Sequence, residues 1–180
     1  MLADLFEVRE TESKGKGLFA KKFIPKGTIS SFQCKACKVV TAEELGYDKM
    51  SDKEKLDLFC YAYRREDGLF VLPCGIDRYM NHSCNANILG TELGFDIVVR
   101  DIREGEEATF DYRDFYESIK MPCCCGEENC CKEVTFEHPI PEDLKKFWHD
   151  RTESAIQMID KVDQPLKEVL KGEGKWPFDE

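Results

Sequence analysis

The sequence predicts an α+β fold, mostly β with short helices, and three observations lead to this prediction. The first 40 residues contain repeated glycine and proline breaks between short apolar segments. Two stretches after them carry helix-capping patterns, and apolar residues recur at helical spacing only beyond Pro141. With 180 residues, 42% of them hydrophobic, the chain can bury one full core, so we expect one domain with a C-terminal extension.

Short strands are expected over residues 6–40, because no helical period survives the breaks in this stretch. Two hairpins are expected over 59–72 and 88–99, since each pairs apolar segments about a glycine turn. A further strand is expected over 108–112. The first two thirds of the chain should therefore consist mainly of short strands.

Helices are predicted at two places. Thr41 and Ser51 are each followed three residues later by glutamate, which is the capping-box pattern and predicts helices over about 41–47 and 51–57. A longer amphipathic helix is expected over 141–165, and packing against the β core is the favoured role for its apolar face over a partner-binding role. The final residues, Trp176 to Glu180, are expected to form a loose end.

The composition limits the classes of partner and location. A net charge of −10 argues against a protein that binds nucleic acid by neutralising phosphates, and it suits a basic partner, although acidity for solubility explains it equally well. No stretch reaches membrane-spanning length, and nothing near the N-terminus resembles a signal peptide. We therefore expect a soluble intracellular protein that uses its ten cysteines as metal ligands or buried thiols.

Five cysteines lie within nine residues, namely Cys123, Cys124, Cys125, Cys130 and Cys131. In the frame Cys123-x-Cys125-Gly126-x-x-x-Cys130, three thiolates can converge on one ion, because Gly126 permits a tight turn between them. A tetrahedral zinc ion needs a fourth ligand from elsewhere. Registers that use Cys124 or Cys131 remain open.

Cys34 and Cys37 form a separate Cys-x-x-Cys pair. This pair is half a zinc site, and a redox motif would need a thioredoxin-like βα setting that the segment lacks. Ordinary strand cysteines are the favoured interpretation.

Four motifs occur in a characteristic order: a glycine motif over residues 13–20, the Asn-His-Ser-Cys run within 78–87, an acidic-aromatic motif over 106–112, and the cysteine motif over 123–130. Together they resemble the SET-domain lysine methyltransferases, and the resemblance covers residues 5 to 131, roughly 70% of the chain. It implies a SET fold with a pseudoknot over 5–117, a post-SET zinc lid over 118–136 and a C-terminal helical extension over 137–180.

The resemblance implies S-adenosylmethionine-dependent methylation of lysine in a basic protein, with a histone or histone-like protein as the expected substrate. The alternative is a catalytically silent SET-like module that binds peptide or scaffolds a complex. A remoter alternative is a zinc or redox sensor. Neither nucleic acid nor membrane is expected as a direct partner.

The resemblance also assigns roles to individual residues. The cofactor-binding residues are Lys14, Gly15, Lys16, Gly17, Arg78, Tyr79, Asn81, His82 and Tyr112. The implied zinc ligands are Cys84, Cys123, Cys125 and Cys130, so Cys84 supplies the missing fourth thiolate. At Phe110 the resemblance favours di- or trimethylation, and a plain core position is the alternative. Tyr61, Tyr63 and Tyr79 are further candidates for the aromatic wall of the lysine channel. Val134 or Phe136 is expected to pack over the cofactor.

Tyr112 is the expected catalytic residue. Methyl transfer from a sulfonium to an amine is an in-line displacement, for which the protein mainly supplies alignment, a dry channel and oxygen dipoles near the moving methyl group. A neutral tyrosine hydroxyl provides such a dipole without adding a full charge. The target lysine must be neutral, and burial beside a positive sulfonium lowers its pKa, so no dedicated general base is required.

Overall fold

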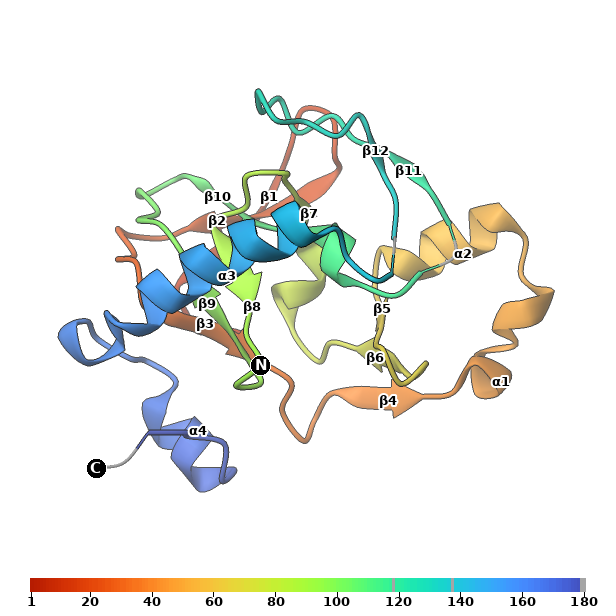
Figure 1. Cartoon of the computed structure of the whole chain (residues 1–180). Helices are drawn as coiled ribbons and strands as arrows, with labels where there is room; N and C mark the ends of the chain where they lie inside the picture. Colours follow the sequence, from red (N-terminus) through yellow and green to blue (C-terminus); the bar gives the residue numbers. More distant parts are fainter. Residues whose placement is uncertain (118, 137, 179–180) are drawn as a thin grey trace.

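The largest sheet of the structure has seven strands in the order β1-β2-β10-β8-β9-β3, with β7 pairing beside β10 (Figure 1). The computed structural model describes residues 1–117, 119–136 and 138–178. The strands of this sheet are β1 (Phe6–Glu10), β2 (Lys16–Ala20), β3 (Ile29–Phe32), β7 (Asn81–His82), β8 (Ile88–Gly90), β9 (Phe95–Val98) and β10 (Glu107–Phe110). Leu18, Ile29, Ile88, Ile97 and Ala108 are fully buried in its core. The prediction of a mostly β fold is confirmed.

Strand β10 joins segments that are far apart in the sequence. It pairs antiparallel with β2, where Ala108 lies opposite Leu18, and parallel with β7, where Phe110 lies opposite His82. It also pairs parallel with β8. Three of the four sequence motifs therefore lie on neighbouring strands. The predicted pseudoknot, in which the C-terminal part of the chain threads through a loop around the Asn-His-Ser-Cys motif, stays a prediction.

Residues 38–72 form a smaller unit, the insert, which lies at the opposite end of the molecule from helix α4 (Lys167–Gly172) (Figure 1). Its elements are β4 (Lys38–Val40), α1 (Ala42–Leu45), the 3-10 helix η1 (Tyr47–Lys49), α2 (Asp52–Phe59), β5 (Tyr63–Arg64) and β6 (Phe70–Leu72), with sheet order β4-β6-β5. Both predicted capping boxes are present, since the Thr41 and Ser51 hydroxyls accept the backbone N–H of Glu44 and Glu54.

The hairpin predicted over 59–72 is wrong in its first strand. Phe59 ends helix α2, and β5 contains only Tyr63 and Arg64. The Phe59 ring packs edge-on against Tyr112, with ring centroids 5.3 Å apart, so a tertiary contact overrides the local alternation of aromatic residues. The hairpin predicted over 88–99 is confirmed, with β8 pairing β9.

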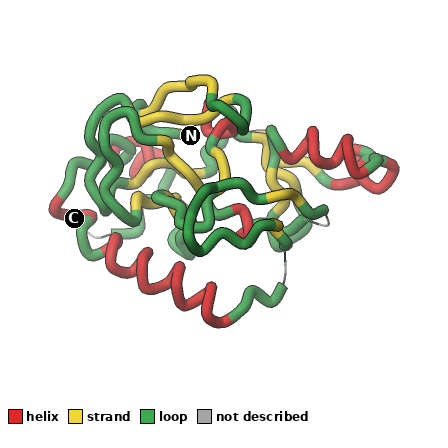
Figure 2. Tube along the Cα trace, turned by 90° about the horizontal axis from the view of Figure 1, so that it is seen from above, coloured by secondary structure: helices red, strands yellow, loops and turns green. Residues whose placement is uncertain are grey.

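The C-terminal segment contains α3 (Glu142–Ile156), the 3-10 helix η4 (Ile159–Lys161) and α4 (Lys167–Gly172). Helix α3 contacts β8 and β9 and runs along one side of the molecule (Figure 2), and its Trp148 and Ala155 are buried in the main core. The predicted packing of this helix on the β core is therefore confirmed. Among the described residues, none of the helices is long and apolar enough to cross a membrane.

The predicted single helix over 141–165 is wrong beyond Ile156. Gly27 lies against the chain at this point, where an added Cβ would be 2.6 Å from Met158 Cβ. The Gln164 amide then donates to the Gly27 carbonyl at 2.8 Å and accepts the Ile29 N–H at 2.9 Å. These bonds hold the chain after α3 against the segment leading into β3.

The prediction of a loose end is wrong for Trp176 and Phe178, whose rings pack against the main core. Lys167 Nζ lies 5.2 Å from the Trp176 ring centroid. Residues 179–180, the rest of this prediction, lie outside the described residues.

Candidate active site

A polar cluster connects the glycine motif with the Asn-His-Ser-Cys motif. The Asn81 amide donates to the Lys16 carbonyl at 3.0 Å and to Glu107 Oε1 at 2.8 Å. The other oxygen of Glu107 pairs with Lys14 Nζ at 2.8 Å. Glu107, at the start of β10, thus links two predicted cofactor-binding side chains. Its role was missed from the sequence, because the acidic-aromatic motif alone does not show which strand lies beside it.

The two glycines of the first motif have different surroundings. Gly15 has a φ of +69°, and a Cβ placed there would meet nothing within 4 Å. At Gly17 an added Cβ would lie 2.8 Å from Glu107 Oε1 and 3.0 Å from Asn81 Nδ2. Gly15 therefore presents open backbone that a ligand can approach, and Gly17 permits the close packing of the polar cluster.

Tyr112 begins the 3-10 helix η3 (Tyr112–Asp114) directly after β10. The strand predicted over 108–112 ends at Phe110, because Asp111 caps η3 through a bond from the Arg113 N–H to its side chain. The Tyr112 hydroxyl donates to the Met80 carbonyl at 2.6 Å, and its backbone N–H donates to His82 Nδ1 at 3.1 Å. Burial raises the pKa of Tyr112, which keeps the hydroxyl protonated.

A cavity of about 930 Å³ lies between the insert and the main sheet, with Tyr112 in its wall. Phe110, Tyr61 and Tyr63 line the same cavity, so the structure brings three of the four predicted channel residues together. Tyr79, the fourth, is not among the residues that line it. The Tyr79 ring lies instead beside Lys16, whose Nζ is 5.4 Å from the ring centroid.

Phe115, which is not one of the predicted channel residues, is the centre of the aromatic side chains in this cavity. Its ring stacks on Phe110 at 5.3 Å and on Tyr63 at 5.0 Å, and it lies 5.7 Å from Tyr112, all between centroids. Phe59 adds a further edge-on contact at 6.0 Å. The contact partners come from α2, β5, β10 and η3, so no local spacing reveals the cluster.

Arg78 lies in the 3-10 helix η2 (Ile76–Tyr79) and lines the cavity. Its guanidinium donates to the Gly75 carbonyl at 2.9 Å and to the Pro73 carbonyl at 2.7 Å. Arg78 thus fixes the loop that carries the chain from the insert to β7.

Two carboxylates in the cavity wall, those of Asp96 and Asp114, are partly buried. Burial raises the pKa of Asp96 to about 6. A hydrogen bond from Ser31 Oγ at 2.5 Å favours the ionised form and partly offsets this effect. Burial, together with the nearby Asp111, raises the pKa of Asp114 to about 6. Both groups are ionised near neutral pH and make the cavity attractive to a cation.

Asp111 anchors the catalytic segment to the C-terminal helix. Its carboxylate is nearly inaccessible, with 1% of the residue exposed. It accepts bonds from Arg113 Nε at 2.9 Å and Nη2 at 2.5 Å, and from Trp148 Nε1 of α3 at 3.1 Å. Arg113 and Trp148 of α3 together fix Asp111, the residue before Tyr112.

The four predicted zinc ligands converge in the structure. The Sγ atoms of Cys84, Cys123, Cys125 and Cys130 all lie within 4.8 Å of one another. Cys123 Sγ lies 3.8 Å from Cys84 Sγ and 3.5 Å from Cys130 Sγ, close to the roughly 3.8 Å between sulfurs that a tetrahedral site with 2.3 Å Zn–S bonds requires. The paired strands β11 (Met121–Pro122) and β12 (Glu133–Val134) frame this group. The residues present therefore fit a closed zinc site.

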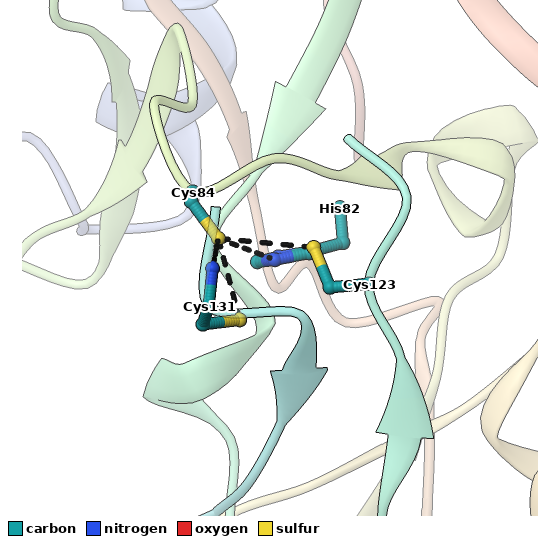
Figure 3. A group of neighbouring side chains, drawn as sticks. All are labelled: His82, Cys84, Cys123 and Cys131. Atoms are coloured by element: carbon teal, nitrogen blue, oxygen red, sulfur yellow. Dashed lines mark hydrogen bonds between the residues drawn. The ribbon is translucent and has the colours of Figure 1, made fainter. Parts of the chain in front are cut away.

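A second group of four shares two of these cysteines and contains His82, Cys84, Cys123 and Cys131 (Figure 3). His82 Nδ1 accepts the Tyr112 N–H, so the proton of the neutral ring lies on Nε2, which faces Cys84 Sγ at 3.4 Å. Burial lowers the pKa of His82 to about 4, which keeps the ring neutral. A protonated Nε2 cannot bind a metal, so this geometry favours the four-cysteine set, with His82 as a hydrogen-bond donor to Cys84.

The post-SET residues also reach the aromatic cavity. Val134 is fully buried against Cys84 and Cys123. The Phe136 ring lies 5.4 Å from that of Phe59, and Tyr112 packs against the same cysteine cluster. The predicted packing of Val134 or Phe136 over a cofactor stays a prediction.

Residues 15–113 match the SET domain family, and the chain belongs to this family. It is similar to a protein of Debaryomyces hansenii named histone-lysine N-methyltransferase, H3 lysine-36 specific, with 32% identity over 181 residues that cover 94% of this chain and 23% of that protein. It is also 30% identical to histone-lysine N-methyltransferase trithorax of Drosophila virilis, over 72% of this chain and 4% of that protein. The chain thus spans less than a quarter of the length of these relatives.

Two solved structures share the fold. The methyltransferase domain of human histone-lysine N-methyltransferase SETMAR superposes with a TM-score of 0.53 at 24% identity, over 73% of this chain and 58% of that one. KRYPTONITE in complex with mCHG DNA and SAH gives a TM-score of 0.52 at 20% identity, over 72% of this chain and 29% of that one. The predicted SET fold is confirmed.

Proposed function

We propose that this protein transfers methyl groups from S-adenosylmethionine to lysine in a basic, histone-like protein. One observation carries the proposal: the glycine motif, Asn81-His82 and Tyr112 lie on adjoining segments around β10, and Tyr112 opens onto an aromatic cavity. The names of the relatives, which are histone-lysine N-methyltransferases, support the same activity. A histone substrate would place the protein in the nucleus.

Residues on one side of Tyr112 would hold the cofactor. When bound, S-adenosylmethionine supplies a methyl group activated on a sulfonium. The open backbone at Gly15 and the polar side chains of Lys14 and Asn81 suit a charged, polar ligand. Glu107 positions both side chains through its two carboxylate oxygens.

Tyr112 would orient the reacting groups. Its proton is donated to the Met80 carbonyl, so the remaining lone pairs of its oxygen are available on the cavity side. Two oxygen atoms, those of Tyr112 and Met80, then lie 2.6 Å apart where a methyl group with partial positive charge would pass. Because the pKa of Tyr112 is raised, the hydroxyl adds no full negative charge at neutral pH.

The cavity would receive the target lysine. Its aromatic surface, centred on Phe115, suits the apolar lysine stem, and burial there favours the neutral amine that attacks. Six carboxylates line the cavity against three guanidinium groups, so its charge favours a basic peptide at the entrance. Phe110 lines this cavity, which supports the expectation that the product is di- or trimethyllysine.

Zinc would close the post-SET segment over this site. The Cys84, Cys123, Cys125 and Cys130 thiolates would bind it, and four protein ligands leave no position for catalysis by the metal. Cys84 lies two residues after His82, so the metal would tie the post-SET segment to the loop that holds the cofactor residues.

The proposal is tested by incubating the zinc-loaded protein with labelled S-adenosylmethionine and a panel of histones and other basic proteins. Tyr112→Phe removes the hydroxyl but keeps the ring, and we expect methyl transfer to fall on the order of 10²–10³-fold while the cofactor still binds. Mass spectrometry of the labelled product then identifies the lysine and the number of methyl groups.

Tyr47→Phe is the matched control, because it removes the hydroxyl of an insert residue that lies outside the cavity wall and donates to Glu117 at 2.7 Å. It should transfer methyl groups at the wild-type rate. Absence of transfer to every protein, together with absence of cofactor binding, would overturn the enzyme proposal in favour of a silent peptide-binding module.

A further inference from the structure

A separate group of cysteines lies at the base of the insert. Cys34 and Cys37 occupy the turn between β3 and β4, and Cys74 follows β6. Cys34 Sγ lies 3.5 Å from Cys74 Sγ and 3.9 Å from Cys37 Sγ, and all three sulfurs lie within 4.8 Å of one another. The Cys-x-x-Cys pair is therefore completed by a residue 37 positions further along the chain. The interpretation as strand cysteines is wrong, because the turn directs both sulfurs toward Cys74.

The geometry fits a thiolate metal site. A tetrahedral ion with 2.3 Å metal–sulfur bonds holds its sulfurs about 3.8 Å apart, close to the observed separations. The Cys37 N–H donates to the Cys34 carbonyl at 3.0 Å, which closes the turn and fixes the two sulfurs relative to each other. Cys34 is buried and Cys74 is exposed, so the group combines a fixed interior ligand with access for an ion from solvent.

We propose that Cys34, Cys37 and Cys74 bind a second thiophilic divalent ion, Zn²⁺ or one of similar chemistry. On binding, each thiol releases its proton to solvent and forms one sulfur–metal bond, with no change of oxidation state. Within the described residues, His, Asp and Glu side chains contribute no fourth member to this group. A water molecule or a small thiol then completes the coordination.

The position of the site gives the metal a structural task. Cys34 and Cys37 lie where the chain enters the insert, and Cys74 lies where it leaves. A metal bound there would cross-link the two connections and close a loop of about 40 residues, which lowers the entropy of the unfolded chain. Cys37, Pro73 and Arg78 from this junction line the cavity, so the metal would also fix the insert wall relative to Tyr112. The site itself does not depend on the proposed activity.

The test counts metal ions in the protein of residues 1–180. The chain is stripped with a chelator under reducing conditions, reloaded with Zn²⁺, desalted and measured by mass spectrometry of the metal. We expect two equivalents in the wild type, one in Cys74→Ser, and one in Cys84→Ser, which removes a ligand of the post-SET cluster instead. Cys60→Ser, an exposed cysteine outside both groups, should retain two.

Co²⁺ titration supplies a second readout, because sulfur-to-cobalt charge-transfer absorbance scales with the number of thiolates bound. In Cys74→Ser the charge-transfer absorbance should fall by roughly three sevenths of the wild-type value, because three of the seven thiolates no longer bind cobalt. Cys37→Ser should give the same loss. Circular dichroism verifies that each variant is folded. One equivalent in the wild type, or unchanged content in both Cys74→Ser and Cys37→Ser, would overturn the proposal, as would a Cys34–Cys74 disulfide in protein kept under reducing conditions.

Discussion

The buried bond between Trp148 and Asp111 predicts a measurable loss of stability in Trp148→Phe. The substitution keeps an aromatic ring in the core but removes the indole N–H that donates to Asp111 Oδ2 at 3.1 Å. Asp111 is 1% exposed, so water cannot replace the missing donor without a structural change. Arg113 still compensates the charge of the carboxylate through two bonds, at 2.9 and 2.5 Å.

The expected magnitude follows from the charge of the acceptor. A hydrogen bond to a charged group contributes about 1.5–3 kcal/mol to the free energy of unfolding. In a chain of this size each kcal/mol shifts the melting temperature by about 2–4 °C, so Trp148→Phe should melt roughly 3–12 °C below the wild type. Because Asp111 directly precedes Tyr112, we also expect slower methyl transfer.

The assay is urea unfolding of the zinc-loaded protein, followed by circular dichroism so that removal of a tryptophan does not affect the readout. Trp176→Phe is the matched control. It makes the same chemical change at the only other tryptophan of the sequence, whose indole packs against the core beside Lys167. Equal unfolding free energies for Trp148→Phe and Trp176→Phe would refute the assigned role of the buried bond.

Three further predictions concern the cofactor loop, the cavity and the zinc lid. In Gly17→Ala the added Cβ would lie 2.8 Å from Glu107 Oε1, so we expect roughly tenfold weaker binding of S-adenosylmethionine by calorimetry, and unchanged affinity would contradict the role of the polar cluster. Burial raises the pKa of Asp96 from 3.8 to about 6, so the folded protein retains a proton that the unfolded chain has lost, and stability falls as the pH rises from about 4 to 6. Asp96→Asn should therefore stabilise the protein by about 1–3 kcal/mol at pH 7.5 and by little at pH 3.5 in urea titrations, and equal effects at the two pH values would argue against it. Cys84→Ser should reduce methyl transfer at least tenfold by releasing the post-SET segment, and chelation of the wild type should do the same; full activity of metal-free protein would exclude this role for zinc.

Local patterns predicted the elements whose causes are local. The Thr41 and Ser51 capping boxes form because each hydroxyl meets an N–H only three residues away. The turn at Gly94 between β8 and β9 forms because glycine tolerates its φ of +82°. Helix α3, by contrast, ends nine residues before Pro165, because Gly27 and its neighbours contact the chain there.

The functional motifs could be identified from the sequence because each requires particular side chains at fixed spacing. The convergence of Cys84 with the post-SET cysteines agrees with the ligand set that the family resemblance implied. Motif spacing does not determine where a side chain points: Tyr79 belongs to a motif, but its ring lies beside Lys16 and outside the cavity wall.

The sequence by itself determined the family, the predominance of short strands and most of the chemistry carried by the four motifs. Only the tertiary structure decided that Glu107 bridges Lys14 and Asn81, that Phe115 centres the aromatic cavity, and that Cys74 joins Cys34 and Cys37. Most of these partners are separated by 26 to 93 residues. Hydrogen bonds, ring contacts and metal coordination act over a few ångströms in space, so chain folding determines which distant side chains they join.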